Sequence, residues 1–514
     1  MRHSSVRRTR CASRVITVTP PVSLWVSLKG NRMKIKPVHK SLSARHALRL
    51  VVGALVLAFG MTGSALPHSK GAAPAAPAAP AAPGAFNPVP LPNPGIPGFV
   101  YPTAPDVIGN WTQKNDQTSI QRHAWGIWTA LTQVSGVKFE GKDLRIFETW
   151  DTPADIGTGA APTAKVTRSL NALMPLRQFG RFAQPQANAK QDEATVTGFV
   201  KYDPVAAAHI RANKLLSLAA LQGLLDKGAA SVPDFPPASL SLKPVFNTLS
   251  SKQLVQGRYF KLAVWPGSPS VPTPFPSAAW GNCVWIDVQE PGAGTGTGQT
   301  DKSCKTDGSS RTPGATYGIG NFIAFRLSAS AIAAMAKPQA GVVSGDYAVL
   351  VAMHVTSREI TQWTWQTFWW TPDANAPPAP SSKAIAALRP AQLTGPARHY
   401  AHCAAYQTLS PPQPDTGGQN KGESVYCFNP YLEAGFGPGD LPDSIPGQYA
   451  GKTVKNNVGV QTNCMSCHAA AAYNPKNIQT APNYAGDRYV DLKDPRFKGT
   501  LQVDFLWSIP GNAK

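Results

Sequence analysis

The spacing of apolar residues changes along the chain from a helical pattern to a strand-like pattern. In the N-terminal half, apolar residues recur at helical intervals over residues 120–134 and 204–227, and Gly228 after the second stretch is a helix-stop residue. Residues 138–150 between them favour extended chain. This half is therefore expected to contain helices.

The C-terminal half is dominated by near-alternating β-branched and aromatic residues, which are typical of strands. Turns rich in proline, glycine and serine separate these segments. The expected strands are residues 239–248, 259–265, 279–290, 347–370 and a closing strand at 500–508, with one short helix at 328–336. The pattern predicts an α+β fold with a mainly antiparallel β-sheet and a few helices.

The first 98 residues have the composition of a leader and a linker. Five Lys and Arg residues between positions 34 and 49 precede an apolar run at 50–60, and small residues at 63–65 offer a cleavage site. We interpret 1–65 as a signal peptide and 66–98 as an Ala/Pro-rich linker that does not join the core. The rest divides into a helix-containing part, 99–235, and a β-rich part, 236–514, which together form either one domain or two.

Charge and hydropathy limit the partners. The 514-residue chain carries a net charge of +21, and subtracting the twelve Lys and Arg residues of the leader leaves +9. No basic run or nucleic-acid motif is present, so we expect no nucleic acid and instead a basic surface that meets an exported redox partner protein. The eleven-residue apolar run falls short of the about 20 residues of a membrane span. We expect no stable span in the mature chain; a retained N-terminal anchor is the alternative.

The seven cysteines fit an exported, periplasmic location. Cys11 lies in the leader, and Cys464 and Cys467 belong to a motif considered next. The four others form an even set in an exported chain, which predicts two disulfide bonds. We favour sequential pairing, which closes short loops, but three connectivities and free thiols remain open. The four cysteines are Cys283, Cys304, Cys403 and Cys427.

The sequence Cys464-Met465-Ser466-Cys467-His468 has the spacing that covalent haem attachment requires. On a helix, residues i, i+3 and i+4 share one face, so both thiols can form thioethers with one haem while the histidine binds its iron. Asn463 is a suitable N-cap for a short helix carrying the haem. The alternatives are a zinc site, which needs two more ligands, and a dithiol redox site, which needs a βαβ context.

The CMSCH motif resembles the haem site of the cytochrome c family, and the resemblance implies one covalent haem c. In the common small class the motif lies near the N-terminus with a methionine ligand downstream, whereas here the 46 residues after His468 contain no Met and no His. P460-like cytochromes share the late position of the motif on a β-rich fold. Residues 344–376, including QWTWQTFWW, look like segments of large exported bacterial c-type cytochromes.

The sixth iron ligand must therefore come from upstream, unless that position is open. His354 is the first candidate because it lies in a strand-like segment, on the face opposite Val351, Met353 and Val355, and neutral imidazole binds iron well. Met353 is expected in the core. The remaining histidine candidates are His123, His209, His399 and His402.

Tryptophans form a second unusual feature. Trp363, Trp365 and Trp369 fall on one face of an alternating run and Trp370 on the other, and Trp507 is expected to join the first three. They either pack the sheet core or wall the haem from water.

Two functions follow from these residues. The first is one-electron transfer by an exported mono-haem cytochrome c with His468, and on this hypothesis His354, as axial ligands. The second is a haem enzyme with an open iron site, peroxidase-like or acting on small nitrogen compounds. A structural or sensory haem is a third possibility.

Overall fold

The computed structural model describes residues 87–139, 142–157, 196–329, 332, 341–437, 447–449, 452–454, 458–476 and 488–514. All of these residues fall within one compact unit. Its α-helices are α1 (Pro105–Gln113), α2 (Gln117–Thr132), α3 (Pro153–Gly157), α5 (Pro204–Ala212), α6 (Leu218–Asp226), α8 (Lys383–Ala387), α9 (Cys464–Ala469) and α10 (Ser508–Asn512).

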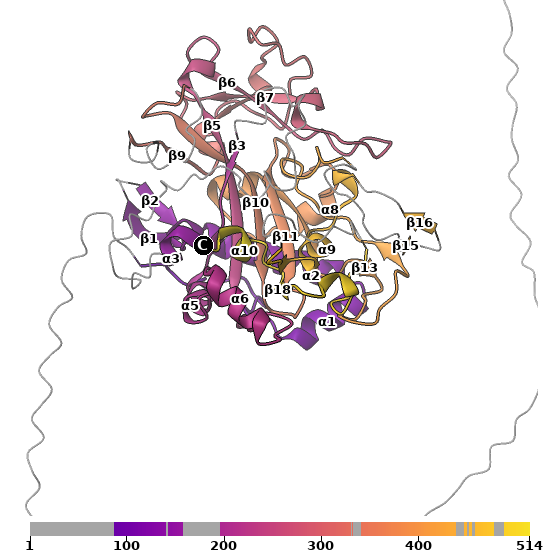
Figure 1. Cartoon of the computed structure of the whole chain (residues 1–514). Helices are drawn as coiled ribbons and strands as arrows, with labels where there is room; N and C mark the ends of the chain where they lie inside the picture. Colours follow the sequence, from indigo (N-terminus) through magenta and orange to yellow (C-terminus); the bar gives the residue numbers. More distant parts are fainter. Residues whose placement is uncertain are drawn as a thin grey trace, which may run out of the picture. The chain divides into compact units, whose positions relative to one another are not determined.

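The fold is α+β with mainly antiparallel sheets, as the sequence predicted (Figure 1). The larger strands are β5 (Leu240–Leu249), β6 (Tyr259–Ala263), β7 (Cys283–Asp287), β10 (Tyr347–Ser357), β11 (Thr364–Trp370) and β12 (Tyr400–Ala405). The shorter strands are β1 (Val134–Phe139), β2 (Lys142–Arg145), β3 (Val196–Gly198), β4 (Lys201–Tyr202), β8 (Thr316–Gly318), β9 (Ala324–Arg326), β13 (Leu409–Ser410), β14 (Glu423–Ser424), β15 (Gly447–Tyr449), β16 (Lys452–Val454), β17 (Ala472–Tyr473) and β18 (Leu501–Gln502).

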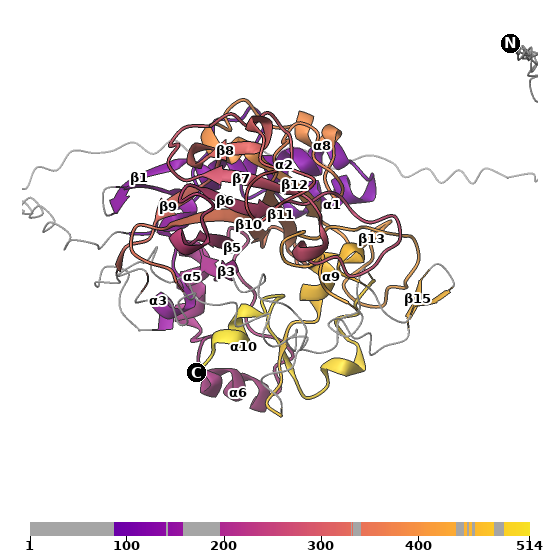
Figure 2. The same cartoon turned by 90° about the horizontal axis from the view of Figure 1, so that it is seen from above.

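A central sheet with the order β12-β11-β10-β5-β3 organises the molecule. The single strand expected over residues 347–370 is divided into β10 and β11, which pair antiparallel, and β5 pairs antiparallel with β10 on its other edge. Because successive side chains of a strand point to opposite sides, each strand contributes to two different layers. Figure 2 shows α2 on one side of this sheet and α9 and α10 on the other.

The side of the sheet beneath α2 is an apolar core. Trp125 and Trp128 of α2 are fully buried, and the ring of Trp128 stacks on Phe368 of β11 at a centroid distance of 4.3 Å. Met353 lies in this core, as expected, and so does Trp370. Full burial of such a side chain contributes about 1.5–3 kcal/mol, so this layer fixes the register of the sheet.

The opposite side holds a second core around the C-terminal helices. Trp363, Trp365, Trp369 and Trp507 all belong to it, which confirms that the first three share a face and that Trp507 joins them. Ala469 of α9, the alanines that follow it and the Cys403–Cys427 disulfide complete this layer.

The N-terminal part and the β-rich part share the central sheet. β3 and β4, from before position 235, both pair with β5. Val89 and Leu91, in the stretch expected to be a linker, pack against the core, and Trp150 donates a hydrogen bond to the carbonyl of Val89. The expectation that the linker does not join the core was therefore wrong for residues 87–98, because apolar side chains of an extended proline-rich segment can still pack against a core.

Several element boundaries differ from the sequence prediction. The single helix expected over 204–227 is divided into α5 and α6, since Lys214 has a positive φ of 53° and Ser217 caps a new helix by accepting from Ala220. Residues 138–150 are extended only to Arg145 and then form a 3₁₀ helix, Ile146–Thr149. Most of the helix expected at 328–336 lies outside the described residues.

The closing strand expected at 500–508 is only two residues long. β18 ends at Gln502, and the chain then turns at Asp504 and Phe505, both with positive φ, before α10. A period-two pattern of apolar residues does not reveal such a turn.

Both predicted disulfides are present with the sequential pairing. Cys283–Cys304 links β7 to the loop that precedes β8, and Cys403–Cys427 links β12 to the segment before α9. Within the described ranges, no helix is long and apolar enough to cross a membrane.

His402 predicts an acid sensitivity of the fold. Its ring is fully buried between Trp125 and Phe368, neither nitrogen has a partner among the described residues, and burial lowers its pKa to about 3. The unfolded chain therefore binds a proton below its ordinary pKa of about 6.5 that the folded chain does not, and stability falls as the pH drops below that value.

We expect His402→Leu to remove this part of the acid dependence. Relative to pH 7.5, the wild type should lose about 2 kcal/mol more than the variant at pH 5, measured by denaturant unfolding. Equal losses in both proteins would show that His402 is not the group responsible.

Candidate functional site

The CMSCH motif forms the first turns of helix α9, as predicted. The side chain of Asn463 accepts a hydrogen bond from the backbone N–H of Ser466, which confirms its role as N-cap. The helix ends at Ala469, and the chain then enters β17 at Ala472. The helical turn places Cys464, Cys467 and His468 on one face.

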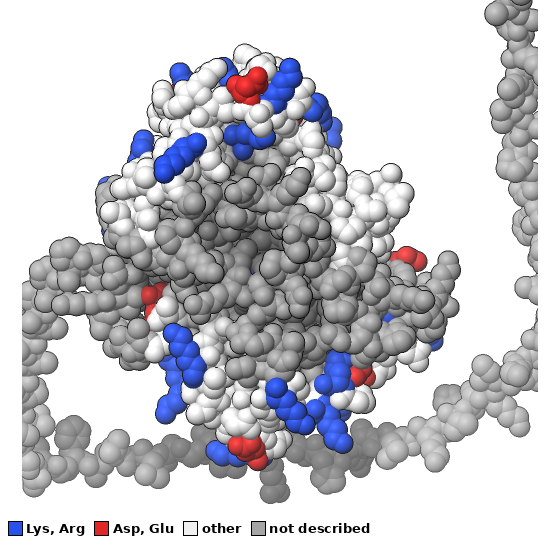
Figure 3. Space-filling model, turned by 45° about the horizontal axis from the view of Figure 1, so that its top comes forward, with Lys and Arg blue, Asp and Glu red and all other residues white. Residues whose placement is uncertain are grey.

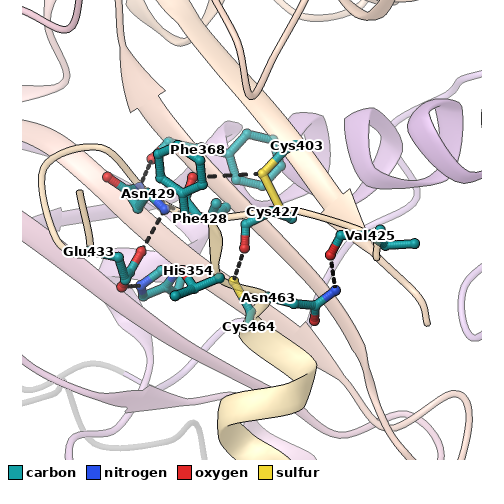
Figure 4. The surroundings of a disulfide bond; sticks show 12 residues. His354, Phe368, Cys403, Val425, Cys427, Phe428, Asn429, Glu433, Asn463 and Cys464 are labelled. Carbon is teal, nitrogen blue, oxygen red and sulfur yellow. Dashed lines mark hydrogen bonds and ion pairs between the residues drawn. A yellow bond between two sulfur atoms is a disulfide. The ribbon is translucent and has the colours of Figure 1, made fainter. Parts of the chain in front are cut away.

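Backbone and side-chain hydrogen bonds attach the start of α9 to the segment around Cys427. The N–H of Cys427 donates to Thr462 at 2.9 Å, and the N–H of Cys464 donates to the carbonyl of Cys427 at 3.3 Å. The buried amide of Asn463 donates to the carbonyls of Gln407 and Val425. Figure 4 shows this arrangement beside the disulfide, which connects Cys427 to β12.

His468 is oriented by two contacts. Its Nδ1 lies 2.7 Å from the carbonyl oxygen of Phe505, so Nδ1 carries the proton and donates it, leaving the Nε2 lone pair free to bind a metal. The ring of Trp365 lies against the imidazole at a centroid distance of 4.0 Å. Burial lowers the pKa of His468 to about 3, which keeps the ring neutral as an iron ligand must be.

The two cysteines of the motif are free thiols and are not joined to each other. Burial raises the pKa of Cys467 to about 12 and that of Cys464 well above its usual value, and the nearby Glu433 carboxylate acts in the same direction. Both thiols are therefore protonated at neutral pH and unreactive as a dithiol redox pair.

An open cavity lies between α9 and the central sheet, and its empty space together with the adjoining solvent amounts to about 1040 Å³. Cofactor sites are mostly apolar with a few polar groups. Its lining is of that kind and consists of Val200, Ser241, Leu242, Lys243, His354, Val355, Thr356, Trp365, Cys427, Glu433, Phe436, Thr462, Asn463, Cys464, Cys467, His468, Leu506, Trp507 and Ser508.

The polar groups of the cavity lie around His354. His354 of β10 lies directly opposite Lys243 of β5, and its Nε2 is 2.8 Å from Oε1 of Glu433. The other oxygen of Glu433 accepts from the N–H of Asn429. Burial lowers the pKa of Lys243 to about 8, an effect that the Glu433 carboxylate partly offsets.

His354 thus shares one cavity with the CMSCH residues, but neither of its ring nitrogens is immediately available to bind a metal. Nε2 is engaged by Glu433, and Nδ1 is buried without a hydrogen-bond partner among the described residues. Direct ligation requires that the imidazole turn or that Glu433 release it.

The other histidine candidates do not line the cavity. His402 lies on the α2 side of the sheet, and His123 bonds to Tyr406 and Glu359. His209 contacts Phe235 and the carbonyl of Pro233, and His399 closes a 3₁₀ helix before β12.

The described residues offer no conventional metal cluster. No group of three or more His, Cys, Asp or Glu side chains among them is arranged to hold a metal ion. A zinc site at Cys464 and Cys467 needs two further ligands of this kind, which this part of the chain does not supply.

Sequence reasoning missed three groups that shape the site. Lys243 carried a signal, since a lysine in the middle of an otherwise apolar strand demands a partner. Glu433 and the carbonyl of Phe505 carried none, because they reach the cavity from turns whose paths depend on tertiary packing.

Comparisons with models of known protein families, with curated proteins and with solved structures find no match to this chain. The site's chemistry therefore has to be argued from its own residues.

Because α9 is hydrogen-bonded to the segment around Cys427, we expect the two disulfides to contribute unequally to the stability of the fold. Their loops span 24 and 21 residues, so chain entropy alone gives each about 3 kcal/mol of stability. We expect the double variant Cys403→Ala/Cys427→Ala to lose more than this in denaturant unfolding, because the hydrogen bonds that hold α9 loosen as well. Cys283→Ala/Cys304→Ala is the matched control, and equal losses would refute the coupling.

Proposed function

We propose that this protein is an exported mono-haem c-type cytochrome that transfers one electron. The observation that carries the proposal is the juxtaposition of two free thiols and a neutral imidazole on one helical face that lines a largely apolar cavity. These are the donor groups, and the surroundings, that a covalently attached haem requires.

Each residue has a defined task in this proposal. Cys464 and Cys467 would hold the cofactor through thioethers, and His468 would bind its iron. A bound haem supplies an iron that alternates between the ferric and ferrous states. Trp365 and Trp507 exclude water from the His468 side, and Trp507 also donates a hydrogen bond to the carbonyl of Cys467.

The opposite side of the cavity decides between the two functions. With His354 as a second axial ligand, the site is suited to electron transfer. The hydrogen bond between His354 and Glu433, next to Lys243, specifically favours the alternative, a haem enzyme with an open iron position. Such groups can take up and return protons of a small ligand such as a peroxide.

Two features support export and a protein partner. Both disulfides require an oxidising compartment such as the periplasm. Figure 3 shows blue Lys and Arg side chains scattered over one face with few red acidic ones, which suits docking to an acidic redox partner.

Covalent attachment is the first test. Protein produced in a host that attaches haem c should keep its haem absorbance after denaturation and acid–acetone extraction, and Cys464→Ala/Cys467→Ala should lose it. Cys283→Ala/Cys304→Ala, which leaves the motif intact, should retain it. A wild-type protein that carries no haem under these conditions would refute the proposal.

Optical spectra with and without carbon monoxide distinguish the two functions. Electron transfer predicts a low-spin haem that does not bind carbon monoxide, and His354→Ala should convert it to a high-spin form that does. A high-spin wild type that binds carbon monoxide would instead establish the open site.

Glu433→Gln provides a companion variant for the same experiment. It keeps the size of the side chain and weakens its hold on the imidazole, so it should favour ligation by His354 and raise the low-spin fraction. If neither His354→Ala nor Glu433→Gln changes the optical spectrum, His354 does not bind the iron.

A further inference from the structure

The carbonyl group that orients His468 belongs to an unusual turn. Asp504 and Phe505 have φ values of 45° and 65°, and the N–H of Leu506 donates to the carbonyl of Val503 across them at 3.0 Å. Turns with two successive positive φ values favour Gly, Asn and Asp, whereas a phenylalanine in this conformation is strained. Other interactions must therefore hold the turn in place.

A buried ion pair supplies the strongest of these interactions. The carboxylate of Asp504 accepts from Nε of Arg358 at 2.9 Å and from the N–H of Phe235 at 3.0 Å. Arg358 lies in the connection between β10 and β11 and is itself fixed by the bond from its N–H to Ser239. Both charged side chains are less than one-tenth exposed, so solvent does not screen the pair.

These contacts form a continuous path from the sheet to the imidazole. Arg358 extends from the β10–β11 hairpin, Asp504 receives it, and the next residue, Phe505, accepts the proton of His468 Nδ1. An acceptor at Nδ1 fixes the tautomer, the plane of the ring and the basicity of the nitrogen that faces a metal.

We propose that the Asp504–Arg358 ion pair is the positioning element of His468, acting through the Phe505 carbonyl to set the orientation and electron-donating strength of the axial imidazole. The inference rests on the proposed haem function for its redox consequence. Its geometric consequence, the Nδ1–H tautomer of His468, concerns this chain's own residues alone.

The redox test uses the haem-loaded protein and the variant Asp504→Ala, which removes both acceptor bonds and disfavours the positive φ. A weaker acceptor at Nδ1 makes the imidazole a poorer donor to ferric iron, so the midpoint potential should shift to a more positive value. Asp504→Asn keeps an acceptor and tolerates the turn but removes the charge of the pair, so it should recover only part of the wild-type potential.

The matched control is Asp151→Ala, which breaks the ion pair between Arg211 and a similarly buried Asp151 whose Oδ2 lies 2.7 Å away. Among the described residues, no hydrogen bond is seen between that pair and the turn that holds His468. Asp151→Ala should lower the melting temperature without changing the midpoint potential. Equal midpoint potentials in Asp504→Ala, Asp151→Ala and the wild type would overturn the inference. If Asp504→Ala does not fold, Arg358→Lys replaces it, and we expect a smaller positive shift of the potential.

A second measurement separates this inference from the proposed function. In full-length protein produced without haem and labelled with ¹⁵N-histidine, the His468 ring should be the neutral Nδ1–H tautomer, and Asp504→Ala should convert part of it to the Nε2–H form. An unchanged tautomer in the variant would overturn the inference. Absence of haem from the wild type would refute only the proposed function.

Discussion

The alternation of side chains along β10 is the constraint on which the rest of the structure depends. Met353 belongs to the core beneath α2, whereas the next residue, His354, lines the cavity. Because β10 is paired along both edges, a slip of its register by one residue would turn Met353 toward the cavity and His354 toward that core. The apolar core on one side thus holds an imidazole in place on the other.

This placement creates an electrostatic problem that the C-terminal segment resolves. Lys243 and His354 are cross-strand neighbours, and burial of the Lys243 ammonium beside the imidazole is unfavourable without a carboxylate nearby. Glu433 supplies the compensating carboxylate, and Asn429, which donates to Thr367 and Phe368 of β11, fixes the turn that delivers it. The segment that supplies Glu433 therefore also contains Cys427, whose carbonyl accepts a hydrogen bond from the N–H of Cys464 at the start of α9.

The sequence was sufficient for features that depend on local spacing. The α+β class, helix α2, the strand-like character of residues 347–370, the N-cap Asn463 and the faces of the tryptophans follow from period and composition, and short loop length favoured the disulfide pairing that is found. What it did not show arises from contacts between distant segments. The break between α5 and α6, the turn at Asp504 and the packing of Val89 are set by tertiary partners, and so is the approach of Glu433 to His354. The haem itself stays a prediction from CMSCH.

Under the proposed function, the choice between electron carrier and enzyme reduces to a competition for one nitrogen of His354. Glu433 is held by the N–H of Asn429, so its carboxylate is already oriented when it meets Nε2 of His354, and little ordering entropy opposes that bond. Binding of this nitrogen to a haem iron would require the ring to leave this acceptor. His468 faces no such competition, because its Nδ1 proton is committed to Phe505 and Nε2 keeps its lone pair. The two histidines thus differ in preorganisation, which is why the His468 side of the site is defined by the fold and the His354 side by the balance with Glu433.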